Sequence, residues 1–197
     1  MSEVEGNASS QKLERKPRLF IGIAIDEAAR MQCAVIADKL RARRPNLQFV
    51  EPENYHLTLA FLGNVEAGCL AHIERLAVDV ASRHRLFSVT LNRVGAFPHE
   101  RKPRVIFIGS RGADPAYRAL AADVGDACRR LGFPIDEKDD IPHATIARVP
   151  DRKRVTLPLI DVPSTTIAVH ELTLFESVPS AGKVRYRVRA IGALSAA

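Results

Sequence analysis

Two stretches of the sequence decide the fold, YHLTLAFLG at residues 55–63 and IPHATIARV at residues 141–149. Each contains the pattern His-x-Thr-x within an apolar run that is typical of a β-strand. Because successive side chains of a strand alternate between its two faces, a histidine and a threonine two positions apart project from the same face. Each stretch therefore predicts a strand that presents an imidazole beside a hydroxyl, with its apolar residues directed into a core.

The polar residues of these motifs are suited to proton transfer at a phosphate. They are His56, Thr58, His143 and Thr145. Two such strands facing each other across a cleft would supply one imidazole that accepts a proton, another that donates one, and two hydroxyls that hold an oxyanion. In-line displacement at a phosphodiester requires this combination.

The surroundings of the two motifs repeat as well. The run RLFIGIAI precedes the first motif and the run RVIFIG precedes the second. Phe20 precedes His56 by the same number of residues as Phe107 precedes His143. The shared strand–helix–strand spacing predicts two related lobes.

The remaining patterns predict three helices and about seven strands. Apolar residues recur at helical spacing in three segments, namely between Asp26 and Pro45, at 66–83 and at 114–131. Strand patterns occupy 18–25, 55–62, 86–94, 104–110, the second motif, 167–177 and 184–192. The Gly- and Pro-containing segment 95–103 reads as a loop. Several strands follow one another as hairpins, so the predicted fold class is α+β rather than a doubly wound parallel sheet.

Composition limits the class of protein further. Residues 1–16 are polar and predict a disordered tail, and 17–197 predicts a single domain made of two lobes. No segment is apolar enough for a membrane span or a secretory signal, so we expect a cytoplasmic protein without a membrane partner. The three cysteines lie far apart with no paired spacing, and we assign them no chemistry.

The net charge of +6 favours polyanionic partners. Near the carboxyl end basic residues occupy alternate positions and would line one face of a strand: Lys183, Arg185, Arg187 and Arg189. Such a row is either a track for a phosphate backbone or a solvated edge strand that uses charge to prevent aggregation. The pattern alone leaves both alternatives open.

A histidine on an apolar strand can also be a hydrogen-bonded core residue or a metal ligand. Paired motifs in matching contexts favour catalysis, and no Cys, Asp or Glu recurs beside either histidine to complete a metal site. Arg148, five residues after His143, could contact phosphate if the strand bends, or lie on the surface. Phe61, five residues after His56, could stack on a base or belong to the core. The other four histidines lack the motif, and we assign them no catalytic role.

These residues and their order resemble the two-histidine phosphoesterases, and within them the LigT-like RNA 2',3'-cyclic phosphodiesterases, once named 2'-5' RNA ligases. The resemblance covers residues 17–192 and is carried by RLFIGIAI, PENYHLTLAFLGNV, VGAFP followed by PRVIFIG, PHATIAR and HELTLFES. It implies a bilobal α+β fold of two pseudo-symmetric lobes, with mostly antiparallel sheet, helices packed outside and a positively charged central cleft. The chain departs from the family at Phe49, where relatives often have tryptophan, and at the acidic segment 136–140, which bears on substrate preference.

The resemblance also implies roles for the motif residues. His56 would be the proton donor and His143 the proton acceptor, while Thr58, Thr145 and Arg148 would bind the substrate phosphate. The reaction would be hydrolysis of an RNA terminal 2',3'-cyclic phosphate to a 2'-phosphate, with no metal or cofactor.

The substrates would be RNA with 2',3'-cyclic phosphate ends, or cyclic nucleotides, and we expect the protein to be a monomer. Two other functions remain open. One is 2'-5' RNA ligation, the same reaction in reverse. The other is a module that binds RNA ends without catalysis, although binding alone would favour arginine or lysine over histidine.

Overall fold

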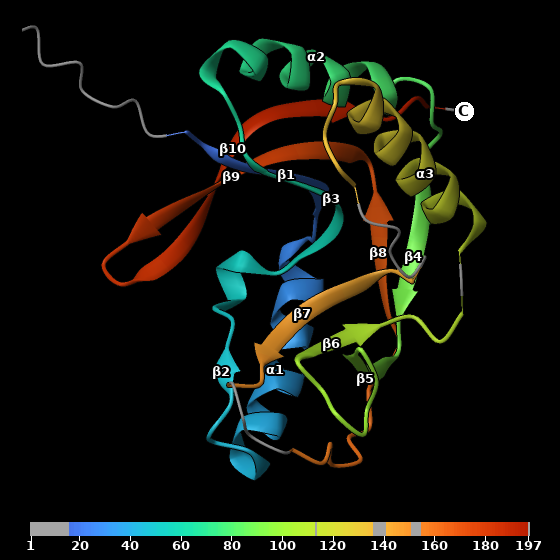
Figure 1. Cartoon of the computed structure of the whole chain (residues 1–197). Coiled ribbons are helices and arrows are strands. Elements are labelled where there is room, and N and C mark those ends of the chain that lie inside the picture. Colours follow the sequence, from blue (N-terminus) through green and yellow to red (C-terminus); the bar gives the residue numbers. More distant parts are fainter. Residues whose placement is uncertain (1–15, 113, 136–140, 151–154, 197) are drawn as a thin grey trace, which may run out of the picture.

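The computed structural model describes residues 16–112, 114–135, 141–150 and 155–196, which contain three α-helices and ten strands (Figure 1). The helices are α1 (Glu27–Arg43), α2 (Leu70–Ala81) and α3 (Pro115–Arg130). The strands before the second motif are β1 (Arg18–Ala24), β2 (Gln48–Phe49), β3 (His56–Asn64), β4 (Phe87–Leu91), β5 (Arg93–Phe97) and β6 (Val105–Gly109). The later strands are β7 (His143–Arg148), β8 (Thr165–Val169), β9 (Glu171–Ser180) and β10 (Lys183–Ala193).

Most strands belong to one antiparallel sheet with the order β10-β9-β1-β3-β7-β6-β5, and β2 pairs with β7 beside this path. β4 and β8 form a separate two-stranded antiparallel sheet. The predicted α+β class with mostly antiparallel strands is therefore confirmed.

The large sheet has two halves, which meet at the two motif strands. One half consists of β10, β9, β1 and β3, and the other of β7, β6, β5 and β2. β3 and β7 pair where Leu57 lies opposite Ala144, the middle residue of each His-x-Thr. In this antiparallel pairing His56 lies opposite Thr145 and Thr58 lies opposite His143, and all four side chains line the same pocket. The motifs are thus related by a local twofold arrangement.

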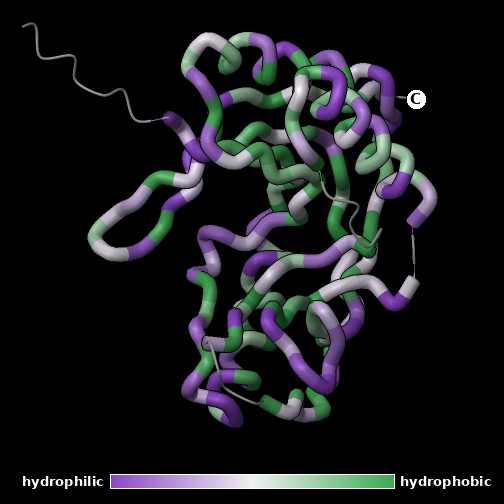
Figure 2. The backbone as a smooth tube through the Cα atoms, in the orientation of Figure 1, coloured by the Kyte–Doolittle hydropathy of each residue, from purple (hydrophilic) through white to green (hydrophobic). Residues whose placement is uncertain are grey.

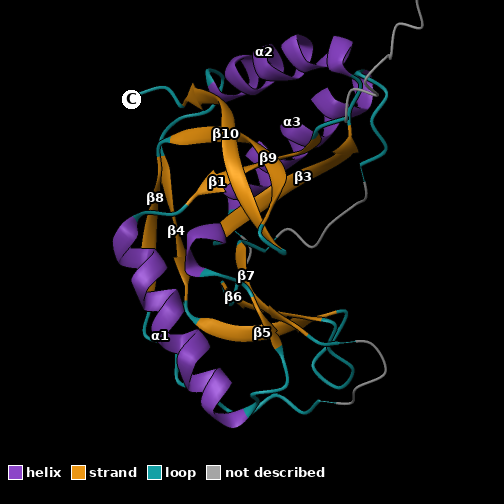
Figure 3. Ribbon diagram, turned by 90° about the vertical axis from the view of Figure 1, so that its left-hand side faces the viewer, coloured by secondary structure: helices purple, strands orange, loops and turns teal. Residues whose placement is uncertain are grey.

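The helices cross between the halves. α1 follows β1 along the chain but packs against β7 and β8, whereas α3 follows β6 and packs against α2 and β3. In Figures 1 and 3, α1 lies beside the β7–β6–β5 half, and both α2 and α3 cover the other half. The hydroxyl of Tyr117 on α3 donates to the carbonyl of Thr58, 3.4 Å away. Each repeated strand–helix–strand unit therefore spans both halves.

Local signals explain where α1 and α3 begin. The Asp26 carboxylate accepts a hydrogen bond from the Ala29 amide at 2.8 Å, and Asp114 accepts one from the Tyr117 amide at 2.9 Å. Both are N-caps that pair an amide which has no partner within the helix. Pro115 occupies the first turn of α3, where its fixed φ suits a helix.

The core is one continuous cluster that includes residues of both halves. β1 is buried along its five central residues and pairs with β3 along one edge and with β9 along the other. In Figure 2 the hydrophobic segments, drawn in green, run through the interior of the molecule. None of the helices within the described residues is long and apolar enough to cross a bilayer.

Two predicted strands are each divided in the structure. The segment 86–94 was expected to be one strand and 95–103 a loop, but β4 ends at Leu91 and β5 continues to Phe97. Likewise 167–177 comprises β8 and β9 with a break at His170. In both cases the chain leaves the small sheet and enters the large one. At each break the apolar alternation shifts by one residue, from Leu91 to Val94 and from Val169 to Leu172, and the prediction of a single strand overlooked this shift. These divisions and the short β2 raise the strand count above the predicted seven.

Some predictions concern residues outside the described ranges. They are the tail 1–16, apart from Lys16, and the acidic segment 136–140.

Candidate active site

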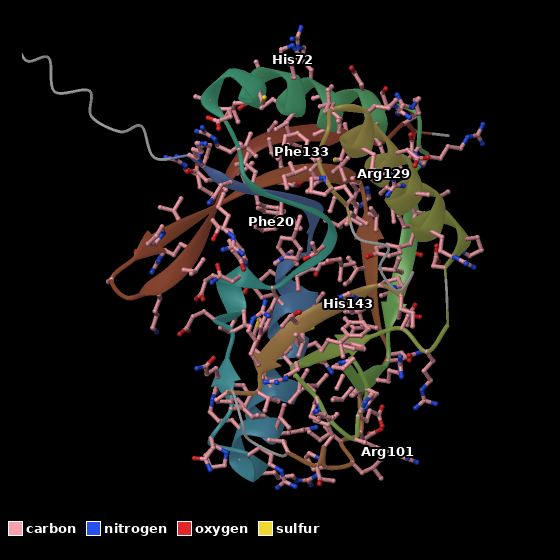
Figure 4. The ribbon with its side chains drawn as sticks, viewed as in Figure 1. Phe20, His72, Arg101, Arg129, Phe133 and His143 are labelled. Atoms are coloured by element: carbon pink, nitrogen blue, oxygen red, sulfur yellow. The ribbon has the colours of Figure 1, made fainter. Side chains whose placement is uncertain are left out.

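A pocket of about 470 Å³ lies between the two halves of the sheet. Its wall includes all six side chains singled out from the sequence, namely His56, Thr58, Phe61, His143, Thr145 and Arg148. In Figure 4, His143 lies at the centre of the molecule, whereas His72 projects from the outer surface of α2. None of the four histidines outside the motifs lines this pocket.

A bulge in each motif strand explains why the fifth residue after the histidine reaches the pocket. Between β1 and β3 the register passes from Thr58 to Ala60 and skips Leu59. Between β6 and β7 it passes from Thr145 to Ala147 and skips Ile146. One extra residue reverses the alternation of faces beyond it. Regular alternation would have turned Phe61 and Arg148 away from the histidines, and the bulges bring both back to the same face.

Both imidazoles are held by the backbone just before their strand. Nδ1 of His56 donates to the carbonyl of Asn54 at 2.7 Å, and Nδ1 of His143 donates to the carbonyl of Ile141 at 2.9 Å. A carbonyl can only accept, so each Nδ1 carries a proton and Nε2 is the atom available for proton transfer. Nε2 of His56 also lies 2.8 Å from Oγ1 of Thr58. The geometry thus presents two oriented Nε2 atoms to one pocket.

Aromatic rings pack against each histidine. The Phe20 ring lies 4.7 Å from the His56 ring, and Phe107, its counterpart in the repeat, lies 5.1 Å from His143. Phe175 stacks on Phe20 at 5.0 Å and Phe97 stacks on Phe107 at 4.5 Å. Each imidazole therefore rests against a stacked pair of phenyl rings, which restricts its rotation.

Phe61 and Arg148 lie at the open side of the pocket. The Phe61 side chain is 46% exposed, so it is not part of the core. Arg148 is exposed as well, and both residues also line a second pocket of about 630 Å³ that adjoins the first. An exposed aromatic ring and a guanidinium are thus available to a ligand beside the paired histidines.

Comparison with known proteins places this geometry in a family. Residues 23–107 match the family model described as LigT like phosphoesterase. The RNA 2',3'-cyclic phosphodiesterase of Methanothermobacter thermautotrophicus is 33% identical over 134 residues, which cover 68% of this chain and 72% of the relative. The protein of the same name from Thermotoga maritima is 31% identical over 163 residues, which cover 81% of this chain and 86% of the relative. The chain belongs to the LigT-like phosphoesterases.

Solved structures agree with this assignment. A crystal structure of E. coli LigT complexed with NADP+ superposes with a TM-score of 0.74 at 28% identity, covering 92% of this chain and 99% of that chain. The fold expected from the resemblance is therefore confirmed at the level of the LigT-like family.

Sequence reasoning missed several residues that line the pocket of this LigT-like protein. Tyr186 of β10 packs edge-on against His56 with ring centroids 5.0 Å apart, and it lines both pockets. Burial raises the pKa of its phenol, while the nearby Arg148 and Arg18 charges act in the opposite direction. Tyr186 is the one aromatic residue in the strand pattern 184–192, and its alternation with Arg185 and Arg187 places it on the opposite face from them. Asn54 was missed because it acts through a carbonyl that any residue possesses.

The basic row on β10 does not face the histidines. Tyr186 points into the pocket, so its neighbours Arg185 and Arg187 project from the opposite side of the strand. Arg187 pairs with Glu176 at 2.6 Å and Lys183 pairs with Glu51 at 2.5 Å. For these residues the structure favours a charged edge strand over a phosphate track.

Two of the three cysteines are buried. Burial raises the pKa of the Cys33 thiol to about 12 and that of Cys128 to about 11, which disfavours a reactive thiolate. Within the described ranges, no group of three or more His, Cys, Asp and Glu side chains could hold a metal ion.

Proposed function

We propose that this chain hydrolyses the 2',3'-cyclic phosphate at the end of an RNA to a 2'-phosphate, with its two His-x-Thr motifs as general acid, general base and phosphate site. The observation that carries the proposal is the arrangement of the two oriented Nε2 atoms and two hydroxyls around one pocket. Relatives named RNA 2',3'-cyclic phosphodiesterase support the substrate.

The reaction needs one proton removed and one supplied. A water molecule attacks phosphorus opposite the 3'-oxygen, and Nε2 of His143 accepts its proton. The bond between phosphorus and the 3'-oxygen breaks, and Nε2 of His56 donates a proton to that oxygen. The products are a 2'-phosphate and a 3'-hydroxyl, and exchange with solvent restores both imidazoles.

The assignment of donor and acceptor follows the family pattern, and one contact supports it. Nε2 of His56 lies within hydrogen-bond distance of the Thr58 hydroxyl, whose oxygen can accept a hydrogen bond from the Nε2–H of the imidazolium form. This contact would hold the donor ready at the side of the leaving oxygen.

Charge that develops on the phosphoryl oxygens would be stabilised by Thr58, Thr145 and Arg148. Hydroxyls contribute a single hydrogen bond each, whereas the guanidinium presents a planar fork that matches two oxygens. The exposed Phe61 ring, beside these groups, would stack on the base of the terminal nucleotide.

The proposal extends to the state of the protein. Both motifs and the rest of the pocket wall belong to one chain, so we expect 17–197 to act as a single domain and as a monomer. An RNA substrate favours a cytoplasmic location. Light scattering of the purified protein would test the monomer directly.

The deciding experiment incubates purified protein with a nucleoside 2',3'-cyclic phosphate in the presence of a chelator. We expect turnover to a 2'-phosphate, identified by phosphorus NMR, in wild type and in the control His72→Ala. A product with a 3'-phosphate, or activity that disappears with the chelator, would contradict the mechanism. Tight binding of RNA ends without turnover would instead favour the binding module.

A further inference from the structure

The second pocket of about 630 Å³ is continuous with the candidate active site. The two share Val50, Asn54, Phe61, Arg148 and Tyr186. We call this second pocket the outer chamber. The motif histidines line only the inner pocket, and the lining of the outer chamber is more polar. A ligand longer than one nucleotide could therefore extend from one space into the other.

The charges around the outer chamber suit a single anion. Arg18 and Arg148 both line it, and among the residues that the structure describes neither has a carboxylate partner. The third basic residue, Lys183, is neutralised by Glu51. The positive charges of both arginines act on the Tyr186 phenol and lower its pKa, but burial has the larger effect and raises it. The phenol is therefore a neutral hydrogen-bond donor.

The chamber also has aromatic surfaces for a base. Phe49 and Phe61 both line it, and Phe61 is shared with the inner pocket. A Phe61 ring that borders both spaces can contact the bases of two consecutive nucleotides. Phe49 is supported from its other side by Arg41, whose guanidinium carbon lies 4.4 Å from the ring centre.

Contacts across the chamber hold its outer wall in place. The wall is the tip of the β9–β10 hairpin, which two side-chain contacts join to residues 51–54. Lys183 reaches Glu51 at 2.5 Å, and the Asn54 side-chain amide donates to the carbonyl of Val184 at 2.7 Å. The chamber is therefore formed before any ligand arrives, which lowers the entropic cost of binding.

We propose that the outer chamber binds the penultimate nucleotide of an RNA substrate, with Arg18 on the phosphodiester that joins it to the terminal cyclic nucleotide. This inference rests on the proposed function, because it assumes that the cyclic phosphate occupies the inner pocket. It makes the protein selective for RNA ends over free cyclic nucleotides. An oligonucleotide supplies both the phosphate and the second base, whereas a mononucleotide supplies neither.

The test compares kcat/KM for three substrates with the same terminal nucleotide: the 2',3'-cyclic mononucleotide, that mononucleotide with a 5'-phosphate, and the corresponding dinucleotide. We expect the dinucleotide to be the best substrate. Arg18→Ala should lower the ratio of dinucleotide to mononucleotide kcat/KM by about 10- to 100-fold, the effect of one hydrogen bond to a charged group. Arg18→Lys should retain part of the ratio, and the control Arg75→Ala, on α2, should retain all of it.

An unchanged ratio in Arg18→Ala would overturn the proposal. So would a 5'-phosphate that provides the whole gain, because the chamber would then bind a phosphate and not a nucleotide. Failure of the wild type to hydrolyse any cyclic substrate would refute the proposed function instead. Calorimetric binding of a dinucleotide 2'-phosphate still tests the chamber in that case, since the affinity must fall in Arg18→Ala whether or not the protein turns over.

Discussion

Strands β3 and β7 begin with the same six-residue arrangement. In both, a half-buried histidine and a half-buried threonine flank a buried residue, two buried residues follow, and the sixth residue is exposed. Both strands have a bulge after the threonine, and both histidines donate Nδ1 to a carbonyl two residues earlier. The strands differ at the sixth residue, which is Phe61 in one and Arg148 in the other.

This difference separates what the backbone provides from what the side chains provide. The repeated backbone orients the two proton-transfer groups alike, so it cannot by itself make one an acid and the other a base. The asymmetry comes from the side chains around the two strands. Tyr186 packs beside His56 only, and the pocket wall has the Phe61 ring from β3 but the Arg148 guanidinium from β7. Chemistry at the phosphate should therefore depend on both strands, and substrate selection on the unlike residues.

The largest effect should follow loss of either histidine. His56→Ala and His143→Ala should each lower kcat by about 10²–10⁴, and the double variant should be little worse because the two act as a unit. On bis(p-nitrophenyl) phosphate, whose leaving group needs no proton, His56→Ala should lose much less activity than His143→Ala. Equal losses on this substrate would contradict the assignment of donor and acceptor, and full activity in either variant on the cyclic substrate would refute the mechanism.

Loss of a motif hydroxyl should have the next largest effect. Thr58→Val and Thr145→Val keep the β-branched shape but remove a hydrogen bond to the phosphate, so each should lower kcat by about 10–10³. Thermal unfolding should change little. Thr166→Val, on β8, is the matched control and should behave as wild type. A loss of rate no greater than that of the control would show that the hydroxyls do not contact the transition state.

The unlike sixth residues should produce unlike defects. Arg148→Ala should lower kcat/KM by about 10- to 100-fold through loss of a charged hydrogen bond. Phe61→Leu should raise KM by about fivefold with kcat nearly unchanged, because stacking holds substrate and transition state equally. Steady-state kinetics on a cyclic mononucleotide separates the two, and identical defects would mean that these residues do not differ in role.

The rate should depend on pH through both histidines. Below the optimum the acceptor becomes protonated, and above it the donor loses its proton, so log kcat/KM should fall by about one per pH unit on each side, within the range where imidazoles titrate, about pH 5–8. In His143→Ala the acid limb should disappear. A wild-type rate that continues to rise at high pH would indicate attack by hydroxide without a general base.

The smallest effect concerns two glycines at equivalent positions of the repeat. A Cβ on Gly22 would lie 2.6 Å from the Leu57 carbonyl oxygen, whereas one on Gly109 would lie 2.8 Å from the Phe107 ring and 3.0 Å from the Pro142 carbonyl oxygen. A backbone atom cannot move as easily as a ring. Gly22→Ala should therefore cost about 1–3 kcal/mol of unfolding free energy, and Gly109→Ala less. Chemical denaturation measures both, and the reverse order would indicate that β1 and β3 can separate without cost.

The sequence predicted what depends on near neighbours. The spacing of apolar residues located the three helices, and alternation in the motif strands placed each histidine beside its threonine. It could not predict what depends on pairing between distant segments. Nothing in the order of apolar residues distinguishes Ile146, the extra residue of a bulge, from an ordinary buried position, so the location of Arg148 stayed open. Tyr186 was overlooked for the same reason, since its role comes from the proximity of β10 to His56.

The crossing of α1 and α3 has a consequence for how the protein reaches its active form. Each half of the sheet is covered by a helix that belongs to the other half's strand–helix–strand unit, so neither unit can bury its own apolar surface alone. Contacts between segments far apart along the chain must form together, which slows folding and makes it cooperative. The two histidines come from different units and share a pocket only when this assembly is complete. A newly made or damaged chain that is only partly folded therefore has no assembled site at which the two histidines could act together.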